Sequence, residues 1–322
     1  MTLVQLEYVV AVDTYRHFAT AAEKTFVTQP TLSMQIQKLE EELGVKLFDR
    51  SKQPVVPTEV GVEIIQQARL LLSQAQSIKQ IITDKKGEIA GELRLGVIPT
   101  LAPYLLPLFL KSFLGKYPKV KLKITELTTE SIASCLKQNK LDAGLLVTPL
   151  QDNSLKEKVL FYEELVAYVS KSNALYHKKY VLPADIDLKM LWLLEEGHCF
   201  RSQIVNLCEL RSALPEGKAF EYEAGSVETL RRMVEQDNGI TIIPELATLD
   251  LTTKQQKLVR YFDAPAPVRE VSLVTHRDYV KKRLIQVLQE EIMAALPEKI
   301  RHNTSARVVQ IENNKIKSMF KI

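Results

Sequence analysis

The chain has 322 residues, of which 46% are hydrophobic and 25% are charged, and its formal net charge is +4. This composition is that of an ordinary globular protein with enough chain for more than one domain. No apolar run reaches the ~20 residues needed to span a bilayer, and the N-terminus lacks the features of a secretory signal. We therefore expect a cytoplasmic protein without membrane contacts, in which the three cysteines are free thiols. The small net charge does not by itself indicate nucleic-acid binding.

The N-terminal part of the chain has the pattern of a helix-turn-helix. Apolar residues recur at three- and four-residue steps in two blocks, residues 18–22 and 32–43, which predicts two short amphipathic helices. The connector "FVTQ" between them is brief. Thr28 is placed to cap the second helix, and Pro30 falls in its first turn, where proline is tolerated.

The second of these helices and the segment after it have the residues of a DNA-binding surface. In a helix-turn-helix the second helix enters the major groove, with its first turn nearest the base edges. The following "LFDRSKQPVVPT" is short, basic and broken by prolines, which suits a hairpin wing that reaches the phosphate backbone. An ordinary helical hairpin remains the alternative. The expected DNA contacts are Thr28, Gln29, Pro30, Thr31, Ser33, Gln35, Lys38, Arg50 and Lys52.

One long helix is predicted from residue 58 to about residue 86. The segment contains no proline, and apolar residues repeat at helical spacing from Val62 to Ile82. About 27 residues correspond to about 40 Å of helix. Because a small N-terminal domain cannot bury so long an apolar stripe, we expect the helix to pair with its copy in a dimer. Residues 1–57 are thus assigned to the DNA-binding domain and residues 58–90 to the linker and dimerisation helix.

The remainder of the chain, to residue 303, alternates strand-like and helical segments. The strands are "ELRLGVI", "VKLKITEL", "LDAGLLV" and "LVAYVS", and the helices between them include "LLPLFLKSFLGKYP" and "ESIASCLKQNK". This alternation predicts an α/β fold in two lobes. Ligands in such folds bind at the carboxyl ends of strands, which directs attention to Thr100, Thr128 and Thr129. We assign residues 91–163 and 268–303 to lobe I, residues 164–267 to lobe II, and residues 304–322 to a tail without an assigned function.

Two of the cysteines lie in "GHCFRSQIVNLC", where Cys199 and Cys208 are nine positions apart. A thiol attacks peroxide only as the thiolate, and the neighbouring His198 and Arg201 are groups that can stabilise that form. Cysteine is also among the residues most often buried and inert, which is how we interpret Cys135 on the apolar side of a helix. A zinc site is disfavoured because the close CxxC spacing is missing. These residues alone leave a redox pair and two inert thiols as alternatives.

The chain resembles the LysR-type transcriptional regulators as far as about residue 300. The resemblance lies in "FATAAEKTFVTQPTLSMQIQKLEEELGVKLFDR", the long helix and the α/β remainder. Within that family, "IPTLAPYLLP", "LLEEGHCFRSQ", "SVETLRRMV", "GITIIPELA" and the second cysteine are similar to the peroxide-sensing branch. The resemblance implies a winged helix-turn-helix domain, a linker helix, and a two-lobed regulatory domain of the periplasmic-binding-protein type. It also implies a regulator rather than an enzyme, without a cofactor or a metal.

The resemblance implies that Cys199 is the attacking thiol and that its sulfenic acid condenses reversibly with Cys208. If residues 199–208 are helical, the two Cα atoms lie about 13 Å apart, whereas a disulfide tolerates at most about 7 Å. The segment would then have to unwind to close the bond. Ser202 stands where related sequences carry an acid, so a proton transfer by that acid is not expected here. The implied peroxide pocket consists of Thr100, Thr129, His198, Arg201, Ser202 and Arg269.

The implied signal is hydrogen peroxide, and the implied role is activation of oxidative-stress defence genes. The expected partners are pseudo-palindromic sites in double-stranded DNA, further copies of the chain in a homodimer and homotetramer, and RNA polymerase. One alternative is a regulator gated by a small organic ligand in the cleft between the lobes, with incidental cysteines. A dithiol peroxidase is the other, and the DNA-binding module argues against it.

Overall fold

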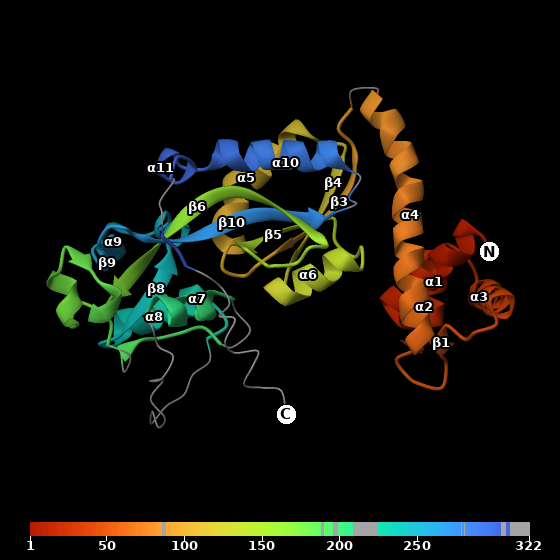
Figure 1. Ribbon diagram of the computed structural model, residues 1–322, viewed down its shortest axis with the longest axis horizontal. Coiled ribbons are helices and arrows are strands. Elements are labelled where there is room, and N and C mark those ends of the chain that lie inside the picture. The colour runs from red at the N-terminus through yellow and green to blue at the C-terminus, as the bar shows by residue number, and fades with distance from the viewer. Residues whose placement is uncertain are drawn as a thin grey trace.

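The computed structural model describes residues 1–85, 88–187, 190–195, 199–208, 224–277, 279, 281–303 and 307–309. Figure 1 shows a long helix with a small helical domain gathered around one of its halves, and a larger domain built on a mixed sheet. The winged helix-turn-helix and two-lobed α/β architecture predicted from the sequence is therefore confirmed. No helix among these residues is both long and apolar enough to cross a membrane.

The small domain is a winged helix-turn-helix. Its apolar positions, such as Leu32, Ile36 and Leu39, are fully buried, as the helical spacing predicts. Thr28 does precede the second helix of the motif, but its hydroxyl caps no backbone N–H and lies 2.8 Å from the Thr31 hydroxyl, so the predicted cap is wrong. The elements are α1 (Leu3–Tyr15), α2 (Phe18–Lys24), α3 (Gln29–Leu43), β1 (Phe48–Asp49) and β2 (Val56–Pro57), the last two forming the antiparallel wing.

The long helix α4 (Glu59–Lys85) has 27 residues, as predicted from its spacing. It packs against α1, a helix that the sequence analysis did not identify. Arg69 of α4 donates to the Asp13 carboxylate at 2.7 Å, and both side chains are less than one-tenth exposed. Arg16 also pairs with Asp13, at 3.0 Å, but is 38% exposed. The buried ion pair therefore fixes the DNA-binding domain to the linker helix.

The larger domain is built on a sheet in the order β4-β3-β5-β10-β6-β9-β7, with β11 added to β10 and β8 added to β6. The long strand β6 pairs with β10 as far as Glu164 and with β8 from Leu165 onward, so both halves of the domain share it. The strands are β3 (Gly91–Val97), β4 (Val120–Glu126), β5 (Ala143–Thr148), β6 (Leu155–Val169), β7 (Tyr180–Val181), β8 (Ile240–Pro244), β9 (Val259–Phe262), β10 (Pro267–His276) and β11 (Arg307–Val308).

Helices cover both faces of this sheet. In Figure 1, α5 and α10 lie over one face of the first half and α6 lies over the other, while α7 and α8 cover the second half. Buried aromatic side chains such as Phe109 and Phe113 of α5 join the core beneath them. The helices are α5 (Ala102–Lys116), α6 (Thr129–Lys137), α7 (Cys199–Leu207), α8 (Val227–Gln236), α9 (Thr253–Gln256), α10 (Lys282–Ala295) and α11 (Glu298–Arg301), with short 3-10 turns η1 (Ala174–His177), η2 (Pro183–Asp185) and η4 (Glu245–Thr248).

We expect Arg69→Met to lower the free energy of unfolding by about 2 kcal/mol, because it removes a partner from a buried carboxylate. Arg16→Met is the matched control, since it removes a partly exposed partner of the same Asp13 and should cost less than about 1 kcal/mol. Urea unfolding of the full chain, followed by circular dichroism, measures both. Equal losses from the two variants would contradict the anchoring role of Arg69.

Candidate functional site at Cys199

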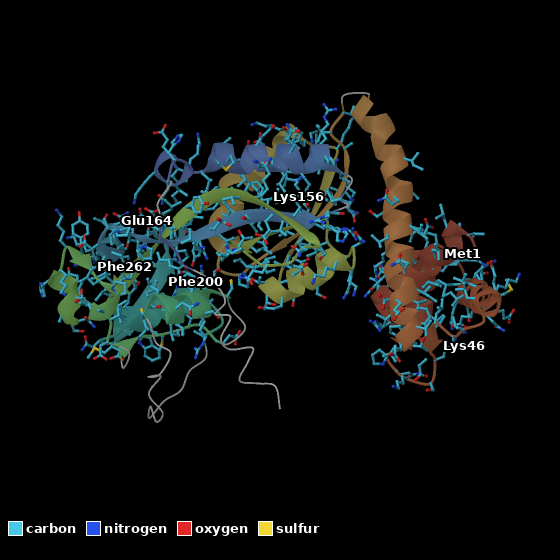
Figure 2. All side chains as sticks on the ribbon, in the orientation of Figure 1. Met1, Lys46, Lys156, Glu164, Phe200 and Phe262 are labelled. Atoms are coloured by element: carbon cyan, nitrogen blue, oxygen red, sulfur yellow. The ribbon has the colours of Figure 1, made fainter. Side chains whose placement is uncertain are left out.

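Cys199 is the first residue of α7 and is buried, with 7% of its surface exposed. The helix is held against the domain by Phe200, Ile204 and Leu207, which are all buried. Their spacing of four and three residues places them on one side of the helix. Phe200, labelled in Figure 2, lies where α7 meets the body of the domain. The thiol is therefore enclosed by the packing of the helix that carries it.

A fully buried arginine of β10 faces this helix. Arg269 donates from Nε to Glu163 Oε2 at 2.7 Å, and from its two terminal nitrogens to the hydroxyl and carbonyl of Thr100 at 3.0 and 3.1 Å. Its guanidinium carbon lies 5.4 Å from the centre of the Phe200 ring. The second oxygen of Glu163 accepts from the backbone N–H of Leu246 at 2.8 Å. These contacts fix the guanidinium beside the start of α7.

The hydroxyl of Thr129, the first residue of α6, lies on another side of the thiol. Thr129 is 6% exposed. Its hydroxyl is close enough to Cys199 to lower the pKa of the thiol, yet it makes no well-formed hydrogen bond within the described part of the chain. Because it lies beside the sulfur, this hydroxyl can donate a hydrogen bond to the charged form of the thiol.

The two cysteines differ in what stabilises their charged forms. The pKa of Cys199 is raised on balance: burial and the negative charge of Glu130 raise it, whereas the Thr129 hydroxyl, the positive charge of Arg269 and the Phe200 N–H each act to lower it. Burial raises the pKa of Cys208 to about 12, with no group opposing it. Because only the thiolate is a nucleophile, Cys199 is the thiol that its surroundings can activate.

The remaining predicted pocket residues have other positions. Arg201 donates to the carbonyl of Leu194 at 2.9 Å and so holds the segment that precedes α7. Ser202 is exposed on the outer side of the helix. His198 lies outside the described residues. Glu163, which anchors Arg269, was not identified from the sequence because nothing in "FYEEL" separates it from a surface acid.

The helix also keeps the two cysteines apart. Cys208 follows α7 directly, and its N–H donates to the carbonyl of Ile204 at 3.0 Å, so the helical turn continues to it. Both cysteines are free thiols. The helical rise over nine residues separates their Cα atoms by about 13 Å, which is beyond the reach of a disulfide. The condition set out from the sequence, a helical segment between the two cysteines, is met in this structure, so a disulfide between them would require α7 to unwind.

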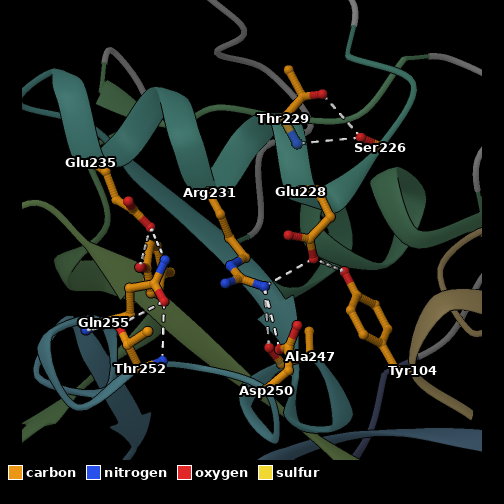
Figure 3. A network of polar contacts seen from close by, with 11 residues as sticks. Tyr104, Ser226, Glu228, Thr229, Arg231, Glu235, Ala247, Asp250, Thr252 and Gln255 are labelled. Atoms are coloured by element: carbon orange, nitrogen blue, oxygen red, sulfur yellow. Dashed lines mark hydrogen bonds and ion pairs between the residues drawn. The ribbon is translucent and has the colours of Figure 1, made fainter. Parts of the chain in front are cut away.

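A polar network joins the two lobes beside this site (Figure 3). Tyr104 of α5 donates to Glu228 of α8 at 2.7 Å, and Arg231 donates to the same carboxylate at 2.9 Å. Arg231 also lies 3.6 Å from Asp250, beyond η4. Burial, together with the hydrogen bond to Glu228, raises the pKa of Tyr104. The network links α8 to α5 of lobe I.

The predicted DNA-contacting residues form two groups. Ser33 accepts a hydrogen bond from Arg50 at 3.0 Å, and Gln35 accepts one from Gln5 at 3.3 Å, so these side chains are partly engaged within the domain. Lys52 of the wing is 3.9 Å from Asp49. The exposed group lies on α3 and just before it, and consists of Thr28, Gln29, Pro30, Thr31 and Lys38.

Comparison with known proteins agrees with both parts of the structure. The family model of bacterial regulatory helix-turn-helix proteins of the lysR family matches residues 3–62, and the model of the LysR substrate binding domain matches residues 86–297. The chain belongs to the LysR family. It is accordingly a DNA-binding transcriptional regulator and not an enzyme.

Several LysR-family relatives align with most of the chain. The hydrogen peroxide-inducible genes activator of Haemophilus influenzae is 33% identical over 276 residues, which cover 85% of this chain and 90% of the relative. The regulator EstR of Acinetobacter baylyi is 34% identical over 282 residues, covering 86% and 91%. A full-length OxyR variant from Pseudomonas aeruginosa has a TM-score of 0.81 and 34% identity, over 95% of this chain and 99% of that one.

We expect Thr129→Val to slow alkylation of Cys199 about tenfold at neutral pH, which corresponds to a rise of about one unit in the pKa of the thiol. The substitution keeps the shape of the side chain but removes the hydroxyl. Cys135→Ser and Cys208→Ser in the same chain leave Cys199 as the only reporter, and the rate is measured from pH 6 to pH 9. Ser134→Ala, on an exposed position of the same helix, is the control. An unchanged pH profile in the Thr129 variant would contradict its role.

Proposed function

We propose that this LysR-family regulator senses hydrogen peroxide through Cys199 and Cys208 and activates oxidative-stress defence genes. The observation that carries the proposal is the set of groups around Cys199, where the fixed guanidinium of Arg269 and the hydroxyl of Thr129 both favour the charged form of one buried thiol. Hydrogen peroxide is a small molecule, and its oxygens can both donate and accept hydrogen bonds. The names of the Haemophilus activator and the OxyR structure support the same function.

The chemistry follows from the groups in the pocket. The Cys199 thiolate attacks one peroxide oxygen, the O–O bond breaks, and the departing hydroxide gains a proton and leaves as water. Cys199 is then a sulfenic acid. In this proposal the hydroxyls of Thr129 and Thr100 and the guanidinium of Arg269 orient the peroxide and stabilise the charge that develops on the leaving oxygen; the hydrogen bond from Arg269 to Thr100 supports a shared role for these two residues. His198, Arg201 and Ser202 remain proposed members of the pocket.

The second step changes the structure. The Cys208 thiol attacks the sulfenic sulfur of Cys199, a second water leaves, and a disulfide forms that a cellular dithiol can reduce. Because α7 must unwind, the contacts that Phe200, Ile204 and Leu207 make with the rest of the domain would be altered. The altered domain would then shift how copies of the chain are arranged on DNA.

The rest of the proposal concerns assembly. We propose that α4 pairs with its copy in a homodimer, that two dimers form a tetramer on pseudo-palindromic promoter DNA, and that the DNA-bound form contacts RNA polymerase in the cytoplasm. The apolar positions Leu71 and Ile78 of α4 lie one heptad apart on the same face and are 48% and 65% exposed in the single chain, which supports a partner for this helix.

A regulator gated by a small organic ligand is the second candidate. The matched regulatory domain is described as substrate-binding, and the name of EstR contains no reference to peroxide. In that case Cys199 and Cys208 would be incidental. Thermal-shift screening of reduced protein with small carboxylates addresses it, because a ligand that binds only the folded state raises its stability.

The direct test is the free thiol count and intact mass of reduced protein before and after one equivalent of hydrogen peroxide. We expect wild type to lose two thiols and two mass units rapidly, Cys199→Ser to lose none, and Cys208→Ser to stop at an oxygen adduct on Cys199. Cys135→Ser is the matched control and should behave as wild type. Slow oxidation that does not depend on which cysteine is replaced would overturn the proposal.

For DNA recognition we expect Gln29→Ala to weaken specific binding by about 1 to 3 kcal/mol, because its exposed side chain lies in the first turn of α3, nearest the base edges. Gln74→Ala, at an exposed position of α4, is the matched control and should leave the affinity within about twofold. Fluorescence anisotropy with promoter DNA at fixed salt concentration measures both. Equal effects would discredit α3 as the reading helix.

A further inference from the structure

Residues 307–309, which belong to the tail that had no function assigned from the sequence, lie beside the redox site. Strand β11 pairs in parallel with β10, so that Arg307 lies opposite Pro267 and Val308 opposite Val268. The N–H of Val309 donates to the carbonyl of Val268 at 2.8 Å, and Val309 is only 6% exposed. The paired residues of β10 immediately precede Arg269, the cation of the Cys199 pocket.

Val309 also contacts α7, the helix between the two cysteines. Gln203 of α7 is completely buried, and its Nε2 donates to the carbonyl of Val309 at 2.9 Å. The other amide atom of Gln203, Oε1, has no hydrogen-bond partner among the described residues. The main chain of Val309 is therefore bonded to β10 on one side and to α7 on the other. Because Oε1 of the buried Gln203 amide is unsatisfied, the contact between Gln203 and Val309 is of limited strength.

We propose that residues 307–309 form a strap that holds α7 in its helical, dithiol form and so opposes closure of the disulfide. This inference rests on the proposed function. Gln203 lies between Cys199 and Cys208, so unwinding of the helix carries its amide away from the Val309 carbonyl. A contact made only by the dithiol form shifts the equilibrium toward that form by the free energy of the contact.

The strap acts on disulfide closure and not on peroxide attack. Its contacts lie on Gln203 and β10, whereas the groups that lower the pKa of the Cys199 thiol are Thr129, Arg269 and the Phe200 N–H. Closure converts two thiols and one peroxide into one disulfide and two waters, and the strap is not consumed. Oxidised and reduced glutathione can exchange with the same pair, which gives a measurable equilibrium constant.

The test uses two substitutions in the full-length chain. Val309→Pro removes the N–H that bonds to β10, and Gln203→Met removes the donor on α7 while keeping an unbranched side chain of similar length. Val308→Pro is the matched control, because the printed bond to β10 comes from the N–H of Val309 and proline enters the same strand one position earlier. The disulfide equilibrium constant is measured in glutathione buffers, and amide hydrogen exchange of residues 199–208 is followed in the reduced protein.

We expect each of Val309→Pro and Gln203→Met to favour the disulfide about tenfold and to speed exchange in α7, as expected for loss of one or two buried hydrogen bonds. The double variant should exceed the larger single effect by less than about twofold, since both act through one contact. Sulfenic acid formation, measured in a Cys208→Ser background, should stay within about twofold of that in the corresponding chain with Gln203 and Val309 intact.

Two results would overturn the strap. In the first, all chains form the disulfide with the same constant and α7 exchanges at the same rate, which leaves the proposed function standing. In the second, Val308→Pro has the same effect as Val309→Pro, which indicates a general loss of stability. If the wild-type chain forms no disulfide between Cys199 and Cys208, the proposed function fails and the strap fails with it.

Discussion

One geometric constraint governs the proposed switch: α7 cannot be a helix and carry the Cys199–Cys208 disulfide at the same time. The helical rise holds the two Cα atoms about 13 Å apart, and a disulfide requires them within about 7 Å. The side chains that pack α7 in the dithiol form are Phe200, Ile204 and Leu207, which are all buried. Whatever stabilises this helix opposes oxidation, and whatever weakens it favours oxidation.

The cation next to Cys199 is held at the junction of the two lobes. Arg269 lies opposite Glu163 in the ladder between β10 and β6, and β6 is the strand that both lobes share. The two side chains are fully buried and neutralise each other, and the other hydrogen bonds of Glu163 and Arg269 reach η4 and Thr100. The cation that assists the thiolate is thus built into the sheet, whereas the thiol sits on a helix that can move relative to it. This arrangement lets the pocket stay rigid before the reaction and separate after it.

Much of this could be predicted from the sequence, because the relevant signals are local. The spacing of apolar residues predicted α3, the linker helix and most strands of the first lobe. The nine-residue interval between the cysteines predicted only that a helical segment there would be too long for a disulfide. The roles of Glu163 and Gln203 could not be predicted, since their partners Arg269 and Val309 are 106 positions away in the chain. Helix α1 was missed because its buried residues are not confined to one face. The positive charge near the thiol was expected from Arg201, but Arg269 supplies it. Tertiary contacts decide which cation faces the thiol, and the sequence does not show them.

Amide hydrogen exchange across residues 199–208, compared between the dithiol protein and the protein oxidised by one equivalent of peroxide, tests the central constraint most directly. The account predicts slow exchange of these amides in the dithiol form, and a loss of protection after oxidation that a cellular dithiol restores. The effect should be confined to α7 and the elements that pack on it, with α10 serving as the internal reference. Equal protection of α7 in both forms, with the disulfide present by mass, would contradict the account.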